Sequence, residues 1–134
     1  MTPRGFRNNN PLNLRISKTL WIGLCPEQRD PEFCQFICME YGILAAIKNA
    51  RNIIAKHRPC TLANLIETWA PSSDGNNTKG YINRVCKLTG LQPTTVLNRN
   101  AKEPLLSVIQ AMTIVENGQE LPANFFDNAY SMLK

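Results

Sequence analysis

A stripe of apolar residues at helical spacing constrains the fold more than any other feature of the sequence. Between Met39 and His57 apolar side chains recur every three or four residues, while polar residues gather on the opposite side. The stripe consists of Ile43, Ile47, Ala50 and Ile54. This spacing predicts a helix over residues 39–57 that buries one face in the core, and Pro59 prevents its continuation.

Turn-forming residues divide the rest of the chain into further helices. Thr61 and Thr78 are typical helix caps, and each precedes apolar residues at helical spacing. Three prolines suit the first turn of a helix and two glycines suit helix ends. The prolines are Pro93, Pro104 and Pro122, and the glycines are Gly90 and Gly118. We therefore expect five or six helices after residue 33.

The first twenty residues have a different pattern. Leu12, Leu14 and Ile16 alternate with polar residues, which favours an extended segment over a helix. A chain of 134 residues is long enough to bury one core without metals or disulfides. We predict a mainly α single domain over 1–134, with an extended N-terminal arm over 1–20 and a helical body over 33–134.

The charge is moderately basic and evenly spread. Fifteen Lys and Arg against ten Asp and Glu give a net charge of +5, which favours anionic partners in general. We expect no nucleic-acid partner, because no basic helix, aromatic RNA platform or zinc finger is visible. No apolar run suits a membrane span or a signal peptide. We therefore expect no membrane partner, synthesis in the cytoplasm without a signal peptide, and delivery by lysis, a virion or a secretion machine if the protein acts outside.

The five cysteines are odd in number and include no C-x-x-C pair, which indicates free thiols rather than a disulfide framework. One alternative is a zinc site. It would use Cys34, Cys38, Cys60 and His57. A second alternative, a Cys–His amidase pair, requires His57 to lie beside Cys25 or Cys34. Our prediction is neither a metal nor a cofactor.

An ordered series of motifs runs through the first two-thirds of the chain. The motifs are Arg7-Asn8-Asn9-Asn10-Pro11-Leu12-Asn13-Leu14-Arg15, Trp21 with Gly23, Phe33 with Phe36, Tyr41-Gly42, Ala45-Ala46, Trp69-Ala70-Pro71, and Asn76-Asn77-Thr78 with Tyr81. The series resembles a small family of phages, prophages and gut Bacteroidetes, usually described as virion or structural proteins and often suspected of a lysozyme-like role. The resemblance implies a lysozyme-like helical fold and an action on the bacterial cell wall.

A fainter similarity extends to the glucosaminidase family that includes the flagellar muramidase. That family places its catalytic Glu upstream of an Asn-Asn segment, where this chain has no acid. Glycan cleavage requires a carboxylic acid to protonate the leaving oxygen. The best-placed candidate is Glu40, in the first turn of the 39–57 helix, where burial by Phe36 and Tyr41 would raise its pKa. The alternative is that Glu40 only stabilises the positive end of its helix.

Asparagine amides and aromatic rings are the expected substrate-binding groups, because amides hydrogen-bond sugars and rings stack on them. The candidates are Asn9, Asn10, Asn13, Trp21, Asn76, Asn77 and Tyr81. The alternative for the asparagines is that they form turns by bonding their own backbone. Trp69 has an apolar helix position and is expected in the core. Since the unusual residues fall in two separated segments, we predict that six of them, without Trp21, border one cleft, with Glu40 at its edge.

These patterns and the resemblance together predict a peptidoglycan-binding protein of phage, prophage or interbacterial-effector origin. Its partner would be the glycan strand, which it would cleave as a lysozyme or lytic transglycosylase if an acid lines the cleft. The alternative is a non-enzymatic phage structural or protein-interaction module that grips a cognate protein through the same groove.

Overall fold

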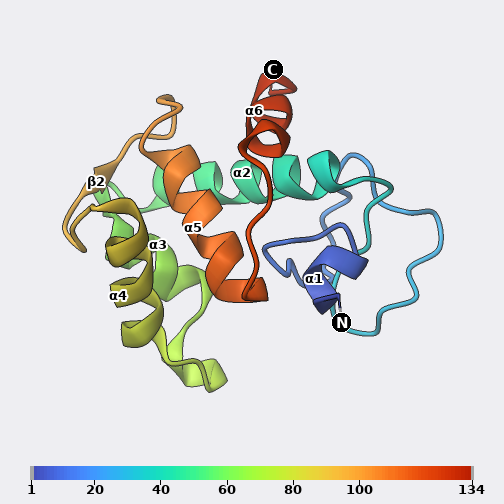
Figure 1. The fold of residues 1–134 in the computed structure, drawn as a ribbon, viewed down its shortest axis with the longest axis horizontal. Coiled ribbons are helices and arrows are strands. Elements are labelled where there is room, and N and C mark those ends of the chain that lie inside the picture. The colour runs from blue at the N-terminus through green and yellow to red at the C-terminus, as the bar shows by residue number, and fades with distance from the viewer. Residues whose placement is uncertain (1, 134) are drawn as a thin grey trace.

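The computed structural model describes residues 2–133, and helices dominate this range (Figure 1). The α-helices are α1 (Arg4–Arg7), α2 (Met39–Lys56), α3 (Leu62–Trp69), α4 (Thr78–Thr89), α5 (Leu105–Asn117) and α6 (Ala123–Ser131). A 3-10 turn, η1, spans Ser72–Asp74, and the short strands β1 (Cys60–Thr61) and β2 (Val96–Leu97) pair antiparallel. The prediction of a mainly α fold is confirmed.

Helix α2 crosses the molecule and organises the core (Figure 1). It packs against α3, α5 and α6, while α4 packs against α3 and α5. Ile43, Ile47 and Ala50 have no exposed surface, and Ile54 is 5% exposed. The predicted apolar stripe is therefore the buried face of this helix, which ends one residue before the expected boundary.

The helix after β1 begins with a reciprocal cap. The Thr61 hydroxyl accepts from the Asn64 backbone N–H at 3.1 Å, and the Asn64 side-chain oxygen accepts from the Thr61 backbone N–H at 3.1 Å. This capping box satisfies two donors that have no partner within the helix. The predicted cap at Thr78 is displaced by one residue, because the Asn77 side chain accepts from the Gly80 N–H.

The segment after Pro93 is not helical, contrary to expectation. It forms a turn and then β2, which pairs with β1. The Pro93 and Thr95 carbonyls accept from the N–H groups of Ala63 and Leu62 at 3.0 and 2.9 Å. These carbonyls satisfy free donors in the first turn of α3, and a continuous helix from Pro93 could not offer them in this way.

Within residues 2–20, the segment expected to be an extended arm contains a short helical turn and buried residues, while residues 15–20 are exposed. Arg4–Arg7 form a helical turn, and isolated bridges join Arg15 to Phe33 and Leu24 to Phe36. Asn9 and Asn13 have φ values of 52° and 53°, a left-handed conformation that Asn tolerates better than most residues. Leu12 and Leu14 are both buried, as their alternation with polar residues suggests. The backbone that carries them is looped rather than extended, because Asn9 and Asn13 adopt the left-handed conformation.

Gly42 lets this segment, hereafter the arm, lie directly on α2. A Cβ at this position would overlap the carbonyl oxygen of Asn9. A larger residue would therefore push the arm away from the helix. Within residues 2–133 no helix has the length and apolar content needed to cross a membrane.

Candidate functional site

A cleft of about 460 Å³ lies where the arm meets the turn after α3. Its walls come from the arm, from α2 and α3, from the turn that contains η1, and from the C-terminal end of α5. Apolar surface is provided partly by Phe33 and Trp69. The polar and charged lining residues are Asn13, Arg15, Asn49, Thr68, Asp74, Asn76 and Glu116. The structure thus brings Asn13 of the arm and Asn76 of the distant turn to one cleft.

Glu116 is the largely buried carboxyl of this cleft. Asn13 Nδ2 donates to its Oε1 at 2.9 Å, and the Tyr81 hydroxyl donates to its Oε2 at 2.9 Å. Burial raises the pKa of Glu116, and the two donated hydrogen bonds oppose that rise without cancelling it. Burial, together with the neighbouring Glu116 carboxylate, also raises the pKa of Tyr81 well above its ordinary value. The site therefore favours the protonated form of this carboxyl more than water does.

The surroundings of Glu116 have more acceptors than donors. Within residues 2–133, Asn13 Oδ1 and Asn117 Oδ1 are buried without a hydrogen-bond partner. A Cβ built on Gly5 would lie 3.1 Å from the first oxygen and 2.5 Å from the second, so both amides converge on this glycine. A proton on Glu116 would add one hydrogen-bond donor next to these two amide oxygens. The Asn13 amide could then rotate by half a turn, so that its oxygen accepts a hydrogen bond from the protonated carboxyl.

The position of Glu116 near the end of a helix could have identified it from the sequence. Glu116 lies in the last turn of α5, two residues before Gly118, which ends the helix with φ of 70°. The last turn of a helix disfavours negative charge. An acid at such a position next to Asn117 is therefore unusual, and this departure from the rule could have singled it out.

The arm asparagines divide between structural and cleft positions. Asn10 is completely buried; its Nδ2 donates to the carbonyls of Leu14 and Cys34 at 3.0 and 2.9 Å, and its Oδ1 accepts from the Leu14 N–H at 3.0 Å. Asn9 Nδ2 donates to the Phe36 carbonyl at 3.0 Å. Neither residue lines the Glu116 cleft, so of the three expected arm asparagines only Asn13 does.

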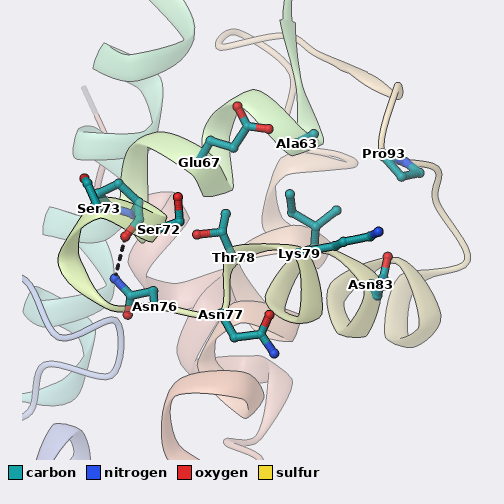
Figure 2. Close-up of a pocket in the computed structure, with 12 residues that line it drawn as sticks. Ala63, Glu67, Ser72, Ser73, Asn76, Asn77, Thr78, Lys79, Asn83 and Pro93 are labelled. Atoms are coloured by element: carbon teal, nitrogen blue, oxygen red, sulfur yellow. Dashed lines mark hydrogen bonds between the residues drawn. The ribbon is translucent and has the colours of Figure 1, made fainter.

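The turn asparagines border a neighbouring pocket of about 730 Å³ between α3 and α4, shown in Figure 2. Asn76 lines both this pocket and the cleft, and its Nδ2 donates to the Pro71 carbonyl at 3.0 Å. Asn77 lines this pocket but not the cleft, and its side chain also caps α4. The six residues expected around one cleft are therefore distributed over several sites, because Asn10 and Asn77 hold backbone turns.

The remaining candidates are not among the residues that line the cleft. Tyr81 reaches Glu116 from behind through its hydroxyl. Trp21 is half-buried against a small cluster formed by Leu14, Cys34, Phe36 and Ala45. Glu40 is half-buried in the first turn of α2 and is not among the cleft residues. The carboxyls that line this cleft are Asp74 and Glu116, so the expected place of Glu40 at its edge needs correction.

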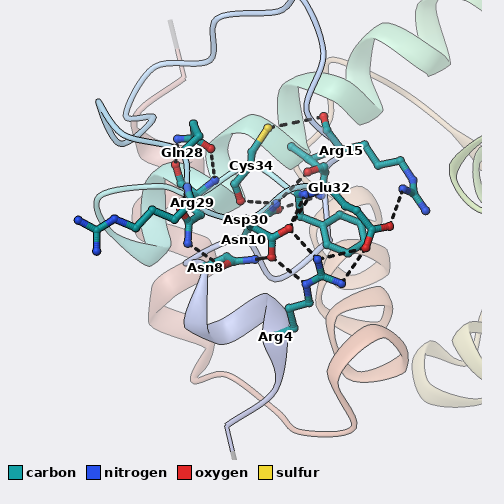
Figure 3. A network of polar contacts seen from close by, with 12 residues as sticks. Arg4, Asn8, Asn10, Arg15, Gln28, Arg29, Asp30, Glu32 and Cys34 are labelled. Carbon is teal, nitrogen blue, oxygen red and sulfur yellow. Dashed lines mark hydrogen bonds and ion pairs between the residues drawn. The ribbon is translucent and has the colours of Figure 1, made fainter.

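A polar network around Asp30 holds the outer part of the arm, as Figure 3 shows. Arg4 donates to Asp30 through Nε at 2.8 Å and Nη2 at 2.7 Å, and Asn8 Nδ2 donates at 3.0 Å. The backbone N–H groups of Glu32 and Phe33 add bonds of 2.9 Å each. The Arg4 guanidinium holds the pKa of Asp30 well below its usual range. The sequence did not single out this pair, since its members are 26 residues apart.

Within the part of the chain that the structure describes, the cysteines and His57 do not form a metal site. All five cysteines are free thiols, and burial raises the pKa of Cys34, Cys60 and Cys86. Within residues 2–133 no group of three His, Cys, Asp or Glu side chains is placed to hold a metal ion. Cys38 precedes α2 and His57 follows it, which puts a helix of about 27 Å between them. This separation excludes the zinc set, which would need Cys38 and His57 side by side.

A comparison with known proteins gives a clear relative. No family model matches the chain. Protein P5 of Pseudoalteromonas phage PM2 is 36% identical to it over 118 residues. The alignment covers 86% of this chain and 71% of the phage protein, so it extends over most of both chains rather than one local motif. The chain belongs to the family of protein P5 of Pseudoalteromonas phage PM2.

Proposed function

We propose that the protein is a phage component that acts as a structural or protein-interaction module, encoded by a phage or a prophage. The observation that carries this proposal is the identity to a phage protein over most of both chains. This agrees with the resemblance of the arm and turn motifs to proteins described as virion or structural. A genetic experiment tests the proposal directly. Deleting the gene should reduce the yield of infectious particles, and expression of the intact chain should restore it.

The outcome that contradicts the proposal is equally clear. If particles form in normal number and infect normally without the gene, the chain has no necessary part in them. A complementation control with the bulky Gly42→Trp substitution, which should unfold the chain where Gly42→Ala only destabilises it, separates loss of the protein from polar effects on neighbouring genes. The structural basis for that control is the close approach of the arm to α2.

The Glu116 cleft favours a second function, binding of the peptidoglycan glycan strand. Its amides can hydrogen-bond the N-acetyl and hydroxyl groups of sugars, and its aromatic residues can pack on their apolar faces. Glu116 would be the acid if cleavage occurs, because a carboxyl with a raised pKa can protonate a leaving oxygen. This second proposal assigns the acid to Glu116 in place of Glu40.

Digestion of purified peptidoglycan tests the second function. Soluble fragments are analysed by mass spectrometry for the wild-type protein, for Glu116→Gln and for Glu40→Gln. Cleavage by this cleft requires that Glu116→Gln releases nothing while Glu40→Gln remains active. Pull-down on insoluble peptidoglycan measures binding without cleavage. If neither binding nor fragments are found, the structural module stands alone as the function.

A further inference from the structure

A small basic pocket lies at the end of α2 remote from the arm. It has a volume of about 320 Å³ and is formed by the C-terminal end of α2, the β1–β2 pair and the loop that follows β2. Its polar side chains are Arg58, Arg99, Asn98 and Asn100. No Asp or Glu is among its lining residues. The pocket shares no residue with the Glu116 cleft.

Arg99 brings a buried polar atom without a partner to this pocket. Within residues 2–133 its Nε atom is buried and has no hydrogen-bond acceptor. The backbone of Arg99 is fixed, because its carbonyl accepts from Arg51 Nε at 3.0 Å. The Asn98 side chain holds the same loop by accepting from the Asn100 N–H at 2.8 Å. A buried donor on a cation without an acceptor is costly, so an acceptor from outside the chain is expected here.

Three arginines near the pocket have no ion-pair partner among residues 2–133. The ion pairs within the described residues involve acids at other places, and none includes Arg51, Arg58 or Arg99. The acid nearest to Arg99 along the chain is Glu103, and its carboxylate accepts hydrogen bonds from the hydroxyl and the N–H of Ser107 at 2.8 and 3.0 Å. Basic residues after a helix stabilise its negative end, which accounts for Arg58 but not for Arg99, which comes from another segment.

We propose that this pocket binds an anionic phosphate group. Two guanidinium groups offer donors in fixed forks that suit phosphate oxygens, and the Asn98 and Asn100 amides add neutral donors. Arg99 Nε would donate to one oxygen from inside the pocket, and the exposed Arg58 would close over the ligand from outside. The site goes beyond the phage role proposed above and does not depend on it. Free phosphate and a phosphodiester chain share this chemistry.

Side-chain NMR of arginine tests the proposal on the full chain. Inorganic phosphate should shift the Arg99 Nε–H resonance saturably, whereas chloride at equal ionic strength should not. Arg58→Gln should weaken the binding about tenfold, a change of about 1.4 kcal/mol. Arg84→Gln, which removes an exposed charge on α4, should leave it unchanged. Equal shifts with chloride, or equal losses in both variants, would overturn the proposal.

A second arm identifies the source of the phosphate. A short oligothymidylate is titrated in place of inorganic phosphate, and saturable shifts at Arg99 with either probe support the site. A response to the oligonucleotide alone assigns the ligand to a phosphodiester chain. Absence of any shift at Arg99 with both probes refutes the site. Because Arg58 is exposed, Arg58→Gln is expected to fold, so the test needs no substitution of the partly buried Arg99.

Discussion

The Tyr81 hydroxyl donates a hydrogen bond of 2.9 Å to Glu116 Oε2, which joins α4 to the last turn of α5 behind the cleft. The arm completes the arrangement from the other side, since Asn13 donates to Oε1 of the same carboxyl. Three segments distant in sequence therefore meet at one carboxyl. The stability and protonation of this junction give the first two predictions.

Glu116→Gln should raise the melting temperature at neutral pH and have little such effect below about pH 4. The raised pKa of Glu116 means that the folded state favours the protonated carboxyl. Its contribution to stability is present below the unfolded pKa and is lost as pH rises through the folded pKa. Gln cannot ionise and escapes that loss. Thermal unfolding of both proteins across pH provides the measurement, and a pH-independent difference would contradict the argument.

Tyr81→Phe should raise the pKa of Glu116 further, because it removes a donor that favours the charged carboxylate. It should also reduce the free energy of unfolding by about 1–2 kcal/mol, the usual cost of losing a buried hydrogen bond. The carboxyl pKa is followed by ¹³C NMR. Tyr130→Phe is the matched control, since no hydrogen bond of its hydroxyl is present within residues 2–133. An unchanged titration of Glu116 in Tyr81→Phe would show that this bond has little effect.

Gly42→Ala should destabilise the protein by about 1–3 kcal/mol, as overpacking does in well-packed cores. The added Cβ would overlap the Asn9 carbonyl and displace the arm from α2. Asn52→Ala on the exposed face of the same helix should change stability by less than about 0.5 kcal/mol. Denaturant unfolding compares the two variants. Equal stabilities would mean that the arm does not need this close approach.

Asn10→Ala should cost more than about 2 kcal/mol, because it leaves buried backbone groups of Leu14 and Cys34 without partners. Asn77→Ala should cost about 0.5–2 kcal/mol, the range for a lost helix cap. Denaturant unfolding measures both, and each variant is also compared with the wild-type protein in peptidoglycan pull-down. A loss of binding at unchanged stability would instead return Asn10 to the role of a ligand-binding residue.

The sequence was informative where periodicity and burial coincide. The stripe from Ile43 to Ile54 faces the core because one side of a long helix must be buried, and that pattern needs no knowledge of the partner segments. The segment after Pro93 was mispredicted because its conformation depends on the free N–H groups of α3. The local helix propensity of this segment gives no information about those distant N–H groups.

The candidate site was predictable only in part. The arm and the distant turn do meet, through Asn13 and Asn76, but proximity alone does not reveal which amides point into a cleft. Asn10 has the same residue type and neighbourhood as Asn13, yet the looped backbone turns it fully inward. Glu116 was missed because it lies outside the motifs, in a helix whose pattern otherwise indicates only a core element.

Quantitative mass spectrometry of purified particles tests the proposed phage role most directly. Particles are collected from the phage or induced prophage that encodes the chain, and its copy number is measured against the major coat protein. The account predicts a constant copy number that survives density-gradient purification and salt washing. Absence of the chain from purified particles, while it is abundant in the infected-cell lysate, would contradict a structural role.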